Sequence, residues 1–139
     1  MEKKIHEGHR QRVKSRYIAE GLDHFQDHEV LELLLFYCIP MKDTNELAHN
    51  MLREFGSLAA ILEADPKDIS RRCGLSEITA ILLSLIPPVS RRYLQDKWGD
   101  KPILSTSSLA GEYAVSLFVG RIYEAFYLIC LDAQNRINN

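Results

Sequence analysis

The chain has 139 residues, of which 46% are hydrophobic, enough for one modest domain or a small domain with an appendage. No run of about 18 apolar residues occurs, so we expect no membrane span, and the charged start lacks the apolar segment of a secretory signal. Three well-separated cysteines argue against a disulfide framework, which predicts free thiols and a cytoplasmic location.

Charge is unevenly distributed along the chain, although the net charge is only −2. Residues 1–16 carry six basic and two acidic side chains, residues 17–70 carry three and eleven, and residues 71–97 carry five and two. If the fold brings the two basic segments together, they form a basic face that favours nucleic acid. The alternative is a solvated surface of mixed charge.

Helical periodicity dominates the first two thirds of the chain. The predicted helices span 9–20, 27–40, 42–56, 57–64, a segment starting at Pro66, 76–86 and 88–98. Glycines and prolines are predicted to stop helices, and polar caps to start them: Gly21, Pro40 and Gly56 as stops, and Asp27, Asp43 or Thr44, and Asp65 as caps. Pro87 and Pro88 are expected to interrupt or kink the last of these helices.

After Trp98 the composition changes. "GDKPILSTSS" is typical of a linker, "SSLAGEYAVSLFVG" predicts a capped amphipathic helix, and "AFYLICL", residues 125–131, predicts a strand that ends at the turn "DAQN". One strand leaves both of its edges unpaired. We therefore expect either that the chain is a piece of a longer protein or that two copies form a homodimer through the 125–131 strand.

The segment "ISRRCGLSEITAILL", residues 69–83, has the layout of a helix-hairpin-helix motif. In that motif a turn with two glycines brings the backbone close to a nucleic-acid phosphate, and the second helix points free N–H groups at it. Gly74 occupies the first glycine position and Ser76 the second, with Arg71 and Arg72 just before the turn. The alternative is a helical connection that only packs the core.

Two histidine-containing stretches have spacings that can hold a metal on a helix, "HEGH" and "HEVLE". Neither supplies three ligands, so we interpret these residues as caps and surface polar groups.

The motifs G-H-R-x-R, D-H-E-x-L-E-L-L-L-F-Y, I-P-x-K-D-T-N and F-G-S-L follow one another over some sixty residues, and "EAFYLICLDAQNRI" closes the chain. Together they resemble the bacterial RadC family, which is named for DNA repair. The resemblance covers nearly the whole chain. It implies a helix-hairpin-helix-like amino-terminal domain followed by a JAB/MPN metallopeptidase-like domain.

In the JAB/MPN fold, zinc is held by an H-x-H pair and an aspartate, and an upstream glutamate acts as general base. The resemblance places that glutamate at Glu124. No histidine follows His49, so we expect no metal or other cofactor in this chain, and zinc only in a full-length parent. Glu124 would be catalytic only if the missing metal site were present.

These observations predict a mainly α protein. The predicted parts are a helix-hairpin-helix-like domain at 1–97, a linker at 98–106, and the first helix and strand of an incomplete α/β JAB/MPN domain at 107–139. The predicted function is weak, non-specific DNA binding without catalysis, and the residues expected to contact DNA are Arg10, Arg12, Lys14, Arg71, Arg72, Gly74 and Ser76. The alternatives are the amino-terminal part of a zinc metallopeptidase and a protein-interaction module.

Overall fold

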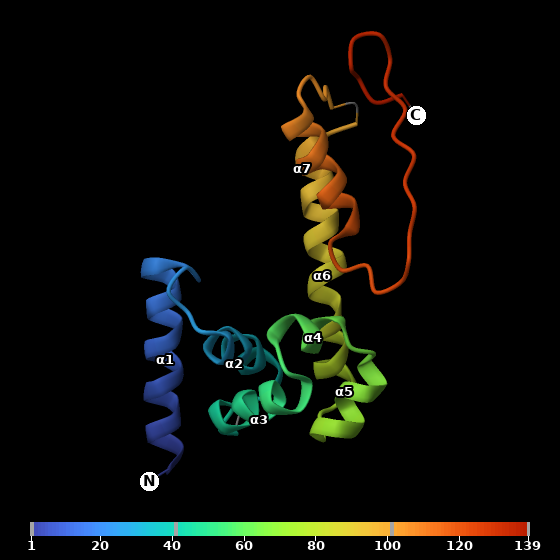
Figure 1. Ribbon diagram of the computed structural model, residues 1–139. Coiled ribbons are helices and arrows are strands. Elements are labelled where there is room, and N and C mark those ends of the chain that lie inside the picture. Colours follow the sequence, from blue (N-terminus) through green and yellow to red (C-terminus); the bar gives the residue numbers. More distant parts are fainter. Residues whose placement is uncertain (1, 41, 101, 139) are drawn as a thin grey trace. The chain divides into compact units, whose positions relative to one another are not determined.

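The computed structural model describes residues 2–40, 42–100 and 102–138, with side chains from residue 8 onward (Figure 1). The described residues form seven helices and no sheet, which confirms a mainly helical chain. None of these helices is long and apolar enough to cross a bilayer. The chain packs as two compact units that divide between Ser84 and Leu85; the predicted domains at 1–97 and 107–139 stay a prediction.

Most helix boundaries follow from local signals. The helices are α1 (Glu2–Glu20), α2 (Asp27–Cys38), α3 (Asn45–Phe55), α4 (Leu58–Glu63), α5 (Pro66–Cys73), α6 (Glu77–Trp98) and α7 (Ser107–Phe118). Ser57, Asp65 and Thr106 each accept a backbone N–H at the start of a helix, at 2.8–3.2 Å. Gly21 and Gly56 end α1 and α3 in left-handed conformations, as predicted.

The start of α2 differs from the prediction. Asp27 is the first helical residue rather than the cap, and Gln26 occupies the cap position. The carboxylate of Glu29 reaches back to accept the N–H of Gln26 at 2.9 Å, so the capping interaction comes from inside the helix.

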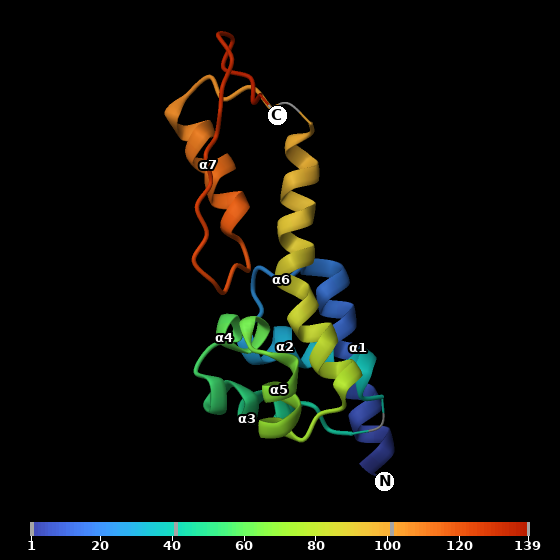
Figure 2. The same cartoon turned by 90° about the vertical axis from the view of Figure 1, so that its right-hand side faces the viewer.

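The core of the first unit lies among α2 to α6. Helix α2 packs against α1, α3 and α4, and α3 also packs against α4 and α5; Figures 1 and 2 show α2 to α5 clustered together. The fully buried apolar residues are Leu31, Leu35, Ala48, Met51, Ile61, Ile69, Ala80 and Leu83. A second small cluster of Val13, Leu33 and Phe36 joins α1 to α2. Because only short loops separate these helices, the apolar face of each packs against helices that are near it in the sequence.

Helix α6 runs without interruption through Pro87 and Pro88. The prediction that these prolines interrupt the helix is therefore wrong. The φ angle that the proline ring imposes is a helical one, so a helix can continue through proline at the loss of one backbone hydrogen bond per proline. The two prolines leave the carbonyl groups of Leu83 and Ser84 without their usual donors four residues on.

The second unit is built on the last turns of α6 and on α7. The rings of Trp98 and Tyr113 meet edge to face, with centroids 5.5 Å apart, and an Arg91 amino group donates to the Val119 carbonyl at 2.8 Å. The turn after α7 contains Gly120 at φ +66°, where an added Cβ would lie 2.4 Å from Pro87 Cβ. This close approach requires glycine.

The strand predicted at 125–131 does not form among the described residues: residues 124–130 belong to no helix or strand and follow an irregular path (Figures 1 and 2). Only isolated antiparallel bridges form, between Leu131 and Ile137 and between Ile103 and Arg136.

Replacing Gly120 with alanine should destabilise the second unit. The side chain would collide with Pro87 and occupy a left-handed conformation, which together should cost more than about 2 kcal/mol. Urea denaturation followed by Trp98 fluorescence measures this, since Trp98 is the sole tryptophan and lies in this unit. Gly111→Ala is the matched control: it lies in α7 with no atom near its added Cβ, and it should stabilise by about 0.5–1 kcal/mol. Equal effects of the two substitutions would contradict the packing described.

Candidate nucleic-acid interface

Arg10, predicted to contact DNA, instead closes the carboxyl end of α2. Its Nη1 donates to the carbonyl of Phe36 at 3.3 Å, and its Nη2 donates to the carbonyls of Ile39 and Lys42 at 2.6 Å each. The guanidinium also lies 4.8 Å from the centre of the Phe36 ring. The last carbonyls of a helix lack donors within the helix, so Arg10 caps the end of α2 and the residues that follow it; its predicted contact with DNA stays a prediction.

A buried carboxylate fixes three helices together beside this cap. Glu32 of α2 is 1% exposed. Its Oε1 lies 2.9 Å from Nε2 of His9 on α1, and its Oε2 accepts from the Asn45 amide of α3 at 3.2 Å. A buried carboxylate is tolerated only when its oxygens are paired. The histidine of the G-H-R motif and the asparagine of the D-T-N motif supply those partners.

The other described basic side chains of α1 differ in whether they have a partner within the protein. Arg16 forms an ion pair with Glu29 at 2.7 Å and lies over the Phe25 ring. Lys14 Nζ lies 5.9 Å from the centre of the Tyr37 ring. Arg12 is exposed and has no ion-pair partner among the described side chains. Among the described side chains of α1, Arg12 and Lys14 are therefore the basic groups with no hydrogen bond or ion pair to another residue.

A short turn at Gly74–Ser76 joins α5 to α6. Gly74 ends α5 at φ +63°, with open space where a Cβ would stand. The Ser76 hydroxyl accepts the Thr79 N–H at 3.3 Å, so serine caps the start of α6. Within the described residues, the N–H groups of Glu77 and Ile78 have no hydrogen-bond partner. These two donors sit at the positive end of a 22-residue helix.

The two arginines before the turn, Arg71 and Arg72, have different partners. Arg71 is exposed and pairs with Asp68 one turn away at 2.6 Å. Arg72 donates through Nε to a Glu54 carboxylate oxygen and through Nη2 to the Glu54 carbonyl, both at 2.8 Å. Since Glu54 belongs to the last turn of α3, Arg72 caps α3 much as Arg10 caps α2. Both side chains are exposed, at 76% for Arg71 and 38% for Arg72, so Arg71 is the more accessible of the two to a phosphate.

A groove of about 770 Å³ lies beside the turn. Its lining residues are Asp65, Pro66, Lys67, Ser70, Arg71, Glu77 and Ile81. The Ser70 hydroxyl is buried and has no partner within the described part of the chain. The groove thus combines two cations and an unused hydroxyl with two carboxylates. Sequence reasoning missed Lys67 and Ser70, although Lys67 stands one helical turn before Arg71.

Glu124, the base implied by the resemblance, is exposed at the start of the segment 124–130. It lines an open hollow of about 570 Å³ with Phe118, Tyr123, Ala125 and Phe126. In the part of the chain that the structure describes, no three His, Cys, Asp or Glu side chains converge to hold a metal ion. These residues do not fit zinc, and no catalytic step is assigned to Glu124.

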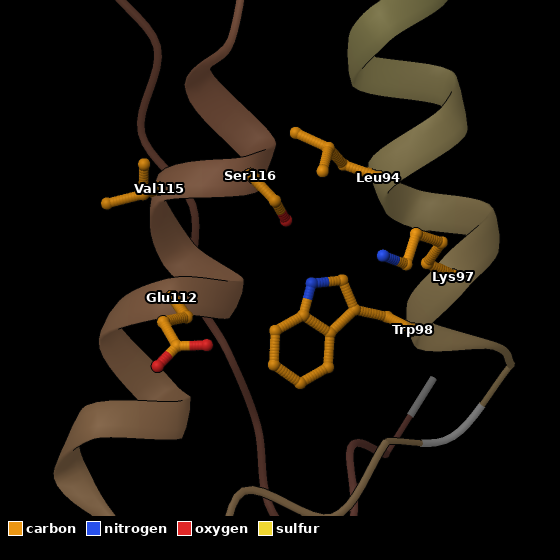
Figure 3. A pocket seen from close by; sticks show the side chains of 6 residues that line it. All are labelled: Leu94, Lys97, Trp98, Glu112, Val115 and Ser116. Atoms are coloured by element: carbon orange, nitrogen blue, oxygen red, sulfur yellow. The ribbon is translucent and has the colours of Figure 1, made fainter. Parts of the chain in front are cut away.

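The described histidines form no ligand set either; His6 of the "HEGH" stretch lies outside the described side chains. His28 of α2 stacks on His49 of α3 with ring centroids 4.2 Å apart. The second unit has a separate pocket of about 590 Å³, into which the Trp98 ring projects from α6 toward α7 (Figure 3). Leu94, Lys97, Glu112, Val115 and Ser116 complete its lining. This pocket contains none of the residues predicted from the sequence.

Arg10→Ala should destabilise the first unit, whereas Arg12→Ala should not. Losing a charged donor to three carbonyls should lower the free energy of unfolding by about 1.5–3 kcal/mol, and an exposed substitution should change it by less than about 0.5 kcal/mol. Denaturation followed by far-ultraviolet circular dichroism measures both. A stability loss shared equally by the two variants would show that Arg10 does not cap α2.

Acid should weaken the attachment of α1 to α2 through Glu29. The hydrogen bond from Arg16, and next the N–H of Gln26, hold the pKa of Glu29 below its ordinary value. The folded state therefore binds fewer protons at this site, so the stabilisation is present at neutral pH and is lost as pH falls below about 4.5. Urea midpoints across this range should fall less steeply in Glu29→Gln than in the parent. Glu63→Gln, at the exposed end of α4, should keep the parent's slope; a parental slope in Glu29→Gln would refute the linkage.

Comparison with known proteins gives one informative relative. No family model matches the chain, and no solved structure matches it. A UPF0758 protein of Fusobacterium nucleatum is 30% identical over 99% of the chain, and the chain spans 62% of that relative's length. The match supports the resemblance to RadC-like proteins, because UPF0758 is the RadC-like family. The chain is thus similar to this UPF0758 protein along nearly all of its residues.

Proposed function

We propose that the first unit is a helix-hairpin-helix-like module that binds the phosphate backbone of DNA weakly and without sequence preference, within a RadC-like protein associated with DNA repair. The observation that carries the proposal is the turn at Gly74–Ser76. It leaves the N–H groups of Glu77 and Ile78 unpaired beside Lys67 and Arg71. Backbone donors read phosphate rather than base edges, so binding would not distinguish sequences.

The charges around the turn explain why the binding should be weak. A phosphate at the start of α6 would gain the two N–H groups, the helix dipole and the two cations. Asp65 and Glu77 line the same groove and repel a phosphate. Arg12 and Lys14 add cations on α1, and Arg10 and Arg72, which also cap α2 and α3, add two more.

The proposed DNA binding concerns residues 1–139 and includes no catalysis. Zinc-dependent peptidase activity is proposed only for a full-length parent and rests on the resemblance, since the described residues hold no zinc ligand set. We propose that residues 1–139 catalyse no hydrolysis.

The proposal predicts a salt-dependent affinity that Arg71→Ala weakens. Fluorescence anisotropy with a labelled 30-base-pair duplex at several salt concentrations measures the slope of log K against log salt. Each lost phosphate contact should reduce that slope by about 0.9. Arg53→Ala is the matched control, since Arg53 is exposed on α3 and bonds only to Asn50. Binding that is absent at low salt, or equally affected by both substitutions, would end the proposal.

Two substitutions at one position isolate the backbone donor. Glu77→Ala removes a repelling carboxylate and should raise the affinity for DNA. Glu77→Pro removes the same carboxylate and also the N–H, at the first helical position where proline is well tolerated. The proline variant should therefore bind several-fold more weakly than the alanine variant, with equal helix content by circular dichroism. Equal affinities would show that this N–H contacts no phosphate.

A further inference from the structure

The groove between α5 and α6 has walls of different chemical character. Its α5 wall carries Lys67 and Arg71, two exposed cations that stand one helical turn apart. Its α6 wall carries Ile81, which is 46% exposed. Ile78 lies one turn before Ile81 on the same helix and is 77% exposed, and side chains three residues apart are neighbours on a helix surface. The groove is therefore cationic along α5 and apolar along α6, where Ile78 extends the apolar surface.

The packing of the first unit does not account for these two isoleucines. Helix α6 buries Thr79, Ala80 and Leu83, and the last two of these belong to the apolar core. Among the described residues, Ile78 and Ile81 belong neither to that core nor to the partly buried side chains packed against it. Their apolar surface is therefore available to a ligand in the groove.

We infer that this groove binds an unpaired nucleotide strand in preference to a duplex, an inference that rests on the phosphate contact proposed above. An unpaired strand leaves the faces of its bases free beside its phosphates. Sites for such strands combine a basic groove for the backbone with a surface on which the bases pack. Lys67 and Arg71 hold the phosphate, and Ile78 and Ile81 pack on the base or the sugar attached to it.

A duplex uses less of the same surface. Its bases are stacked on one another and present only their edges in the grooves of the helix, so no base face reaches the two isoleucines. The phosphates of a duplex still meet Lys67 and Arg71, which gives the weak binding already proposed. The two kinds of DNA therefore share the cationic wall and differ at the apolar wall.

The size and the charges of the groove suit a single nucleotide. Its volume of about 770 Å³ lies within the range of pockets that hold small organic molecules, roughly 300–1,000 Å³. Asp65 also lines the groove, but its carboxylate accepts the Lys67 N–H at 2.8 Å and caps α5. Glu77 is the other carboxylate of the lining and repels a phosphate. The apolar contact therefore supplies affinity that the charges alone do not.

Fluorescence anisotropy with a labelled 30-base oligothymidylate and a labelled 30-base-pair duplex tests the preference. The full chain should bind the single strand about fivefold more tightly than the duplex. Ile78→Ser should weaken binding of the single strand at least about threefold and change duplex binding less than about twofold. The slope of log K against log salt should stay unchanged in this variant, because no phosphate contact is lost. Ile122→Ser is the matched control, since Ile122 is 67% exposed in the second unit, and it should change neither affinity.

A larger side chain provides a test that does not depend on a loss of binding. Ile78→Phe offers a flat ring to a base and should raise the affinity for the single strand about threefold, with unchanged helix content by circular dichroism. Equal affinity of the full chain for the two DNAs, tighter binding of the duplex, or a loss in Ile78→Ser shared equally by both would overturn the inference and leave the phosphate proposal standing. Absence of binding to either DNA would overturn the phosphate proposal itself, and the preference with it.

Discussion

The buried carboxylate of Glu32 is the interaction on which the first unit depends. Taking an ionised carboxylate out of water costs several kcal/mol unless partners replace the lost solvent. Here the partners come from two other helices, His9 on α1 and Asn45 on α3. Helix α2 therefore cannot bury its central turn until α1 and α3 are in place. One polar group thus fixes the assembly of three helices that apolar contacts alone would orient less specifically.

Two arginines also join helices through polar contacts, in this case at helix ends. Arg10 supplies donors to the carbonyls that close α2, and Arg72 supplies them to the last turn of α3. Both had been interpreted from the sequence as ligands of DNA. His9, Arg10 and Asn45 belong to the amino-terminal motifs on which the resemblance rests. Each of them forms hydrogen bonds within the first unit. The similarity to RadC-like proteins is accordingly strong evidence for a shared architecture and weak evidence for a shared contact surface.

The sequence predicted what local interactions determine. Ser57, the Asp65-Pro66 pair and Gly56 mark helix ends through atoms two to four residues away, and these boundaries agree with the structure. The roles of Arg10 and Arg72 depend on carbonyls 18 to 32 residues distant, and no spacing rule reveals such partners. The unpaired donors of Glu77 and Ile78 were expected from the capped turn, whereas Lys67 and Ser70 joined the site only once α5 and α6 were seen to share a groove.

The two units meet the demands of folding in different ways. The first unit satisfies its buried carboxylate and its helix ends internally, through His9, Asn45 and Arg10. The second leaves Phe126 and Leu128 largely in water. The proposed phosphate contacts at the turn between α5 and α6 therefore rest on the first unit alone.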